Sequence, residues 1–408
     1  MTGGVTPPRR SQLRPLLRPL SLLATAAAGW LVAAGAGLTG AAHSPVYSWV
    51  ITALLGLGLY AAAFGIDLSE ARAHLRTVLL AVTVGVLAKV ALIAGVMLLF
   101  FDDDPRVVLL AVAVAQIDPL SVAALRDRSR LSPAGRSLLS AWASFDDPVT
   151  VLLTAYLAAF VLPGDGATGL GVLDTGVVAV LLNLGLNLVF AAAVAALWWA
   201  FRARARRRRE PLTPARRRVL VVLTTVLVLG LAVFAVANAL LLGLAFVGLV
   251  VRPAIGPVID RLAAIALYAG TFAIGVVLVN GVGWVPGLVL GVAAFLAQAV
   301  IALVLPATGL ARGDRLGLAL AQQNGLTAIV LALLLEPVYP GAAGTVAFAV
   351  LVINAGHGLA NARYNRPPPA PDGPGPAPRP APADPPAAPE QAPASLVMPF
   401  RPPEARPS

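Results

Sequence analysis

The stretch SAWASFDDPVTVLL, Ser140–Leu153, places two adjacent carboxylates, Asp146 and Asp147, inside an otherwise apolar run. They follow Arg136 by 10 and 11 residues, or roughly 15 Å along a helix that rises about 1.5 Å per residue. If lipid surrounds this run, each charge costs several kcal/mol unless it is paired or hydrated. Successive residues of a helix point about 100° apart, so one partner cannot cover both carboxylates. The stretch therefore predicts a membrane-spanning helix with a functional site at mid-depth.

Three other polar groups lie at a similar depth on other apolar runs. Asp118, in QIDPLSVAAL (116–125), lies 12 residues after one arginine and 8 before the next. Asn324, in LALAQQNGLTAIVLAL (318–333), lies 9 residues after an arginine and 12 before a glutamate. Lys89, the only lysine of the chain, is 13 residues from the flanking charge on each side. Unrelated polar residues would not agree in depth, so we interpret all five groups as one site.

Two of these runs also contain residues that interrupt a helix. Pro119 follows Asp118 and has no N–H to donate, so the helix should kink or unwind there. The other run has QQNG, Gln322–Gly325, at its centre, a weak helical stretch. Irregular backbone at this depth is tolerated only inside protein or beside a wet cavity, and two interrupted helices are typical of a transporter's central site. For Gln322 and Gln323, hydrogen bonding between packed helices is an equally good interpretation.

The composition assigns the whole chain to the membrane class. Of its 408 residues, 58% are hydrophobic and 12% are charged, whereas soluble domains are about half apolar and a quarter charged. This excludes a soluble enzyme and a nucleic-acid-binding domain despite the net charge of +11. The chain has no cysteine, and His43, His74 and His357 lack the spacing of a metal site. We therefore expect no resident cofactor and no enzymatic activity.

Charges between the apolar runs predict twelve membrane-spanning helices, of which the eighth is short for a full crossing. Their expected bounds are 21–40, 46–66, 77–101, 107–125, 138–162, 177–201, 219–237, 240–251, 262–280, 285–305, 316–335 and 345–362. These spans form one domain over residues 20–365. A basic segment (1–19) precedes it, and a Pro- and Ala-rich tail (366–408) that should be disordered follows it.

The placement of arginines predicts the orientation of the spans. With the N-terminus in the cytoplasm, and counting as far as Arg366 at the C-terminal flank, 25 arginines fall on the cytoplasmic side and only Arg106 on the other. Nine of the 25 lie between Arg202 and Arg218. We interpret this connection as an orientation signal that also contacts anionic lipid, not as a nucleic-acid patch. Both termini are therefore expected in the cytoplasm, and the protein in the cell membrane.

The mid-depth carboxylates predict exchange chemistry. A carboxylate in a partly dehydrated cavity is neutralised by a proton or by a small cation, but poorly by both together. If the cavity opens to either side in turn, this competition is enough to exchange a cation for a proton. Asp147 and Asp118 would supply hard oxygen ligands suited to Na⁺ or Li⁺. Backbone carbonyls at the breaks and hydroxyls such as those of Ser121 or Thr327 would complete the shell.

These residues resemble the monovalent cation–proton antiporter superfamily, with the bacterial sodium–proton antiporter fold, over about residues 20–365. IDPLSVAAL (117–125) is similar to the family's Asp-Pro sequence in its unwound fourth helix, and FDDPVTVLL (145–153) to its aspartate pair one helix later. FGIDLSEARAHLR (64–76) is a weaker match to the loop after an early helix. The resemblance implies an all-α protein of inverted repeats with two crossed broken helices. It also implies a homodimer, and exchange of Na⁺, Li⁺ or K⁺ for H⁺.

The resemblance implies roles for the matching residues as well. Asp147 would be the principal cation and proton carboxylate, Asp146 its charge-balancing neighbour, and Asp118 with its proline part of the crossing. Many relatives place a Lys or Arg in the tenth span to pair with the first aspartate. Here that span offers no base, only Gln298. Lys89 is at the right depth to serve instead, and we expect it to pair with Asp146.

Several alternatives stay open. QQNGLTAIVLAL (322–333) also resembles the crossed helix of sodium-coupled bile-acid and organic-anion symporters, in which an anion is carried with the cation. Three midplane aspartates would repel an anion, so exchange is favoured over symport, and a channel or sensor ranks third. Lys89 could line a water-filled vestibule instead of pairing. Asp67 and Glu336, at the ends of spans, are expected to face water.

Overall fold

The computed structural model describes residues 10–66, 75–101, 104–119, 122, 130–162, 177–207, 214–252, 256–304, 310–322 and 324–364 of the chain. Within these ranges the regular structure is helical, as the apolar runs predict. Asp67, Ser121, Gln323 and the predicted tail 366–408 lie outside them. For the described residues, the all-α class expected from the sequence is confirmed.

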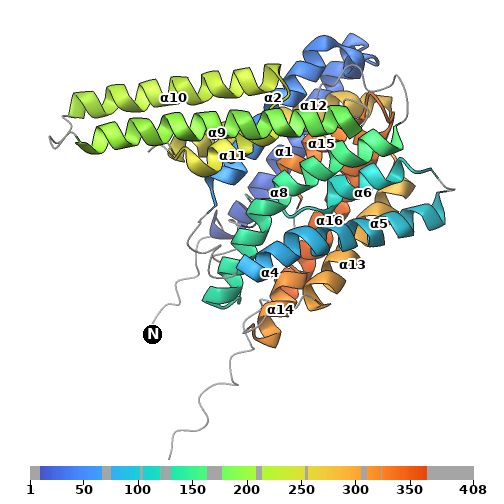
Figure 1. Ribbon diagram of the computed structural model, residues 1–408. Helices are drawn as coiled ribbons and strands as arrows, with labels where there is room; N and C mark the ends of the chain where they lie inside the picture. The colour runs from blue at the N-terminus through green and yellow to red at the C-terminus, as the bar shows by residue number, and fades with distance from the viewer. Residues whose placement is uncertain are drawn as a thin grey trace, which may run out of the picture. The chain divides into compact units, whose positions relative to one another are not determined.

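Six helices form one packed set. They are α1 (Arg10–Ala36), α2 (Pro45–Phe64), α9 (Val177–Arg207), α10 (Pro214–Ala237), α11 (Leu241–Val250) and α12 (Gly256–Val277). In Figure 1, α2 packs on α10, α11 and α12, while α1 packs along α12 and α9 on α11. At Gly275 a Cβ would collide with the backbone of Ala26. Small residues at such crossings let apolar helices approach closely.

A second set carries the polar mid-depth residues. α4 (Leu75–Leu80), a π-helical turn (Ala81–Gly85) and α5 (Val86–Phe100) follow one another without a gap. The other members are α6 (Val107–Ala115), α8 (Pro133–Val161), α13 (Trp284–Val304), α14 (Arg312–Ala319), α15 (Leu326–Leu335) and α16 (Ala342–Tyr364). α6 packs on α5, α8 and α15, and α13 packs on α5, α14 and α16 (Figure 1). Two short 3₁₀ helices, Ala41–His43 and Leu278–Asn280, complete the described regular structure.

The predicted interruptions of two spans are confirmed. α6 ends at Ala115, three residues before Asp118, and the backbone of Gln116 is extended, with φ −80° and ψ 162°. In the eleventh predicted span, α14 ends at Ala319 and α15 begins only at Leu326. A helix end leaves backbone groups without intrahelical partners. Both breaks therefore expose N–H and C=O groups that side chains must satisfy.

The start of α8 is tied to the start of α14. Ser132 caps α8, because its Oγ accepts the N–H of Gly135 at 3.1 Å and Pro133 occupies the first helical position. The same serine donates to the carboxylate of Asp314 on α14, from its N–H and from its Oγ, each at 2.7 Å. This contact holds the half-helix α14 beside the helix that carries the aspartate pair.

Several helices are long and apolar enough to cross a bilayer. Among the described residues there are seven of at least 18 residues, and shorter apolar helices at Leu20–Ala36, Leu241–Val250 and Leu326–Leu335. α9 and α10 bury little of their surface against the rest of the protein. Only 11% of the most apolar stretch of α9 and 17% of that of α10 are buried. Apolar helices that are this exposed need lipid or another apolar surface around them. The protein is therefore a multi-pass membrane protein.

One expectation about a span end was wrong. Glu336 follows α15 and was expected to face water, but it is only 4% exposed. Its carboxylate accepts the N–H of Gly341 at 3.0 Å and that of Ala343 at 2.7 Å, at the start of α16. Burial raises the pKa of Glu336, while these two hydrogen bonds act in the opposite direction. The carboxylate is tolerated there because a helix N-terminus carries free N–H groups and a partial positive charge.

Candidate functional site

Asp147 lies at the centre of the candidate site. It is buried on α8, and its Oδ2 accepts a hydrogen bond from Thr327 Oγ1 at 2.9 Å. Thr327 is the second residue of α15, directly after the break, so the hydroxyl comes from the interrupted span. The other oxygen, Oδ1, is buried and has no hydrogen-bond partner among the described residues. An acceptor buried in this way is stabilised by binding a proton or a cation.

Asp118 belongs to the same site. It is 4% exposed and lies after α6, directly before the partly buried Pro119. Its carboxylate rests against Gly325, where a Cβ would come within 2.5 Å of Oδ2. The first break follows α6, and the second lies between α14 and α15. Only a glycine at position 325 in the second break therefore leaves room for the Asp118 carboxylate of the first break. Two like charges that are buried close together favour a bound positive charge between them.

Asp146 points to different partners from those of Asp147. Its Oδ2 accepts the N–H of Ile117 at 2.9 Å, in the break after α6. The same oxygen lies 3.4 Å from Lys89 Nζ on α5, and both side chains have no exposed surface. The predicted pair is therefore present. Lys89 Nζ also lies 5.4 Å from the ring centroid of Trp142, which the sequence did not single out. An aromatic face within about 6 Å adds to the stability of a desolvated cation.

The two breaks are joined by amide side chains. Gln322 Nε2 donates to the carbonyl of Val114 at 2.8 Å and lies 3.3 Å from that of Gln116. Asn324 Nδ2 donates to the carbonyl of Val114 at 3.0 Å. These carbonyls end α6 and have no partner within that helix. For Gln322 the packing interpretation is therefore the appropriate one, and Asn324 shares this role.

Four further polar residues contact the breaks and were not predicted from the sequence to belong to the site. They are Gln116, Thr150, Gln298 and Asn354. Thr150 Oγ1 lies 3.0 Å from Gln116 Oε1, which ties α8 to the first break. Asn354 on α16 bonds to the backbone of Asn324, and Gln298 Nε2 donates to the carbonyl of Leu318 at 3.1 Å. All four are polar residues inside apolar runs, which is a usable signal. The sequence could not show which helix faces turn toward the breaks.

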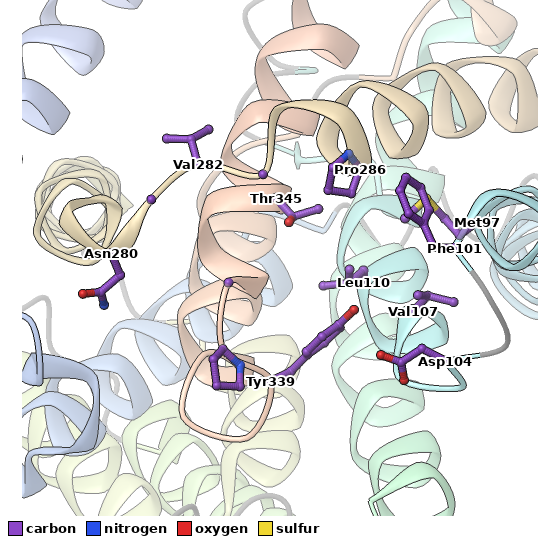
Figure 2. A pocket seen from close by; sticks show the side chains of 14 residues that line it. Met97, Phe101, Asp104, Val107, Leu110, Asn280, Val282, Pro286, Tyr339 and Thr345 are labelled. Atoms are coloured by element: carbon purple, nitrogen blue, oxygen red, sulfur yellow. The ribbon is translucent and has the colours of Figure 1, made fainter.

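A pocket of about 430 Å³ lies at the opposite end of α6 from the break. Figure 2 shows Asp104, Leu110 and Tyr339 on one side of it and Thr345 and Pro286 across from them. The Arg106 guanidinium bonds to Asp104 at 2.9 Å and lies over the ring of Tyr339. The hydrogen bond from Arg106 holds the pKa of Asp104 below its ordinary value. The mid-depth carboxylates do not line this pocket.

The structure thus brings together Asp118, Asp146, Asp147, Lys89, Asn324 and Thr327 around one junction of interrupted helices. Ser121 and Gln323 lie outside the described residues. Within the described chain, no three His, Cys, Asp or Glu side chains gather as a metal site would require. The chemistry available to the junction is binding and release of a proton or a small cation by carboxylates.

The helices are arranged as in solved sodium proton antiporter structures. The sodium proton antiporter MjNhaP1 from Methanocaldococcus jannaschii, at pH 8, matches with a TM-score of 0.62 and 16% identity, over 86% of this chain and 96% of that one. An electron-microscopy map of the same antiporter gives a TM-score of 0.53 at 16% identity, over 77% and 83%. No protein-family model and no curated protein matches the sequence. The chain therefore has the fold of this sodium proton antiporter, as the resemblance implied.

Proposed function

We propose that this protein exchanges a monovalent cation, Na⁺ or Li⁺ and otherwise K⁺, for protons by alternating access. One observation carries the proposal. Asp147 is buried, bonds to Thr327 two residues beyond the glycine on which Asp118 rests, and has one oxygen without a hydrogen-bond partner among the described residues. The antiporter fold supports the same conclusion.

In this proposal Asp147 is the carboxylate that holds the cation and the proton in turn. The Thr327 hydroxyl would keep it oriented, and Asp118 would add a second oxygen ligand and a second negative charge. Because both carboxylates lose hydration on burial, the pair is stable only when a positive charge neutralises part of it. A cation that enters therefore displaces the proton, and the reverse holds when the site faces the other side.

Asp146 has a separate role in the proposed cycle. Its charge is already balanced by Lys89, and its Oδ2 holds the N–H of Ile117, the residue before Asp118. Any change at this ion pair would move Asp147 on one side and Asp118 on the other. We infer that the pair is made and broken as the cation and proton exchange.

The deciding experiment uses the purified protein in liposomes with an imposed pH gradient and a pH-sensitive dye. Na⁺, Li⁺ and K⁺ are added one at a time, with choline as an inert control. We expect at least one of the three cations to dissipate the gradient and choline to leave it unchanged. A gradient that none of the cations dissipates would refute exchange. Uptake of Na⁺ that requires an added organic anion would instead support the symporter.

We also propose that the protein lies in the cell membrane as a homodimer, with both termini in the cytoplasm. The arginine distribution supports this orientation. The chain has no cysteine, so single cysteines can be introduced by Thr39→Cys, at the expected outer end of the first span, and Ala311→Cys, on the expected inner side. In intact cells an impermeant thiol reagent should label the first variant only, and mass measurement in detergent tests the dimer.

A further inference from the structure

Asn354, on α16, bonds to both backbone groups of one residue in the second break. Its Oδ1 accepts the N–H of Asn324 at 2.9 Å, and its Nδ2 donates to the carbonyl of Asn324 at 2.8 Å. Both distances are those of good hydrogen bonds. Asn324 lies between α14 and α15, where the backbone has left the helix. A single amide therefore replaces both backbone bonds that a helix would have supplied there.

The contacts of the site depend on this part of the backbone. Gly325, the next residue, is the surface on which the Asp118 carboxylate rests. Thr327, three residues along, donates to Asp147. The side chain of Asn324 itself bonds to the end of α6. A rotation of the Asn324 peptide would displace all three contacts together.

The same face of α16 also reaches the other end of the break. Asn361, seven residues and about two turns further, donates from Nδ2 to the carbonyl of Leu320. That carbonyl lies at the end of α14, away from Gly325 and Thr327. Asn354 and Asn361 thus bond on the two sides of the break between α14 and α15, but only Asn354 bonds to the side that contacts the carboxylates.

We propose that Asn354 is a positioning residue of the cation site, which fixes the backbone of Asn324 so that Asp118 and Thr327 are both held against Asp147. The inference rests on the proposed exchange function and deepens it. Asn354 touches no transported ion in this account, and it acts through the shape of the second break. Its loss should therefore weaken cation affinity more than it slows the maximal rate.

Two substitutions test this role. Asn354→Leu removes both hydrogen bonds, and we expect the cation concentration at half-maximal exchange to rise about tenfold, which corresponds to about 1.4 kcal/mol of binding free energy. Asn354→Asp keeps an acceptor for the Asn324 N–H, but its carboxyl can donate to the Asn324 carbonyl only when protonated. The ratio of its half-saturation to that of the wild type should therefore fall toward one as the pH is lowered.

Two controls and a binding measurement accompany these variants. Asn238→Leu alters an exposed amide that follows α10 and donates to the Phe234 carbonyl in that helix, so half-saturation should stay at the wild-type value. Asn361→Leu should lower thermal stability with a smaller change in half-saturation than Asn354→Leu. In detergent, the rise in melting temperature on adding Li⁺ or Na⁺ reports cation binding without transport.

The outcomes separate this inference from the proposed function. Wild-type half-saturation in Asn354→Leu, or a pH-independent ratio for Asn354→Asp, would overturn the positioning role while exchange stands. If the wild type exchanges no cation, the exchange proposal fails, and the melting temperatures decide the inference. A cation-induced rise that is lost in Asn354→Leu would then support it, and a retained rise would overturn it. If Asn354→Leu does not fold, the pH dependence of Asn354→Asp decides.

Discussion

Asp146 and Asp147 are neighbours on one helix, at the same depth, and both are buried, yet their surroundings differ. Asp146 meets a lysine and a backbone N–H, so its charge is balanced within the protein. Asp147 meets a hydroxyl and the field of another carboxylate, so its charge is not balanced. The helix turn of about 100° between them directs each to a different span. The comparison shows that Asp146 has its counter-charge within the protein, in Lys89, whereas Asp147 needs a proton or cation from outside.

Substitution of Asp147 should have the largest effect on exchange. Asp147→Asn should leave less than about a tenth of wild-type exchange, because an amide keeps the shape but cannot bind and release a proton. The measurement is cation-induced dissipation of a pH gradient in liposomes, with the fraction of folded protein checked in detergent. Asp260→Asn, at an exposed position on α12, should exchange at the wild-type rate. Retention of more than a tenth by Asp147→Asn would remove Asp147 as the carrier.

The next largest effect concerns the ion pair on the other side of the comparison. Lys89→Gln or Asp146→Asn alone leaves one buried charge unpaired, which should cost about 3–5 kcal/mol of unfolding free energy. The double variant should be more stable than the sum of the two single effects predicts. Unfolding by heat and denaturant in detergent gives the three differences.

A surface pair provides the matched control for this cycle. Arg106 and Asp104 are 2.9 Å apart but 45% and 28% exposed, and the coupling of such pairs is typically below about 1 kcal/mol. Additivity within about 0.5 kcal/mol at Lys89 and Asp146 would reject a coupled pair. It would favour the vestibule interpretation of Lys89 that the sequence left open.

Substitution of Asp118 should have an intermediate effect on exchange, because the proposed role of Asp118 is that of a second ligand and not of the carrier. Asp118→Asn should raise the cation concentration at half-maximal exchange about tenfold, or by about 1.4 kcal/mol, with a smaller loss of maximal rate. Exchange is measured over a range of Na⁺ and Li⁺ concentrations. If half-saturation is unchanged for both cations, Asp118 is not a ligand.

The smallest effect should come from the hydroxyl that orients Asp147. Thr327→Val keeps the shape and removes a hydrogen bond worth about 1 kcal/mol, so half-saturation should rise about fivefold. Thr271→Val is the matched control, since the buried Thr271 hydroxyl donates to Leu267 within its own helix. An equal change in both variants would mean that the effect is one of general packing and not of the Asp147 contact.

Much of the site could be found from sequence, because the cost of burying charge can be judged at each residue by itself. Counting from flanking charges identified Asp118, Asp146 and Asp147, and the missing base in the tenth span identified Lys89 as the partner of Asp146. Asn354 was missed because it is one amide in a long apolar run, and its role depends on the face that α16 turns to the break. The expectation that Glu336 faces water was wrong because its hydrogen-bond partners come from the start of the next helix.

The sequence by itself determined that the chain belongs in a membrane, at what depth its polar groups lie, and where two helices must break. These follow from composition, from the rise per residue and from the missing N–H of Pro119 or the weak helix at QQNG, all of which are local. Only the tertiary structure decided which groups meet. Lys89 pairs with a residue 57 positions away, Thr327 with one 180 away, and Gln322 with one 208 away. Such pairs form because helices that are distant in sequence pack together and leave no water to satisfy their polar groups.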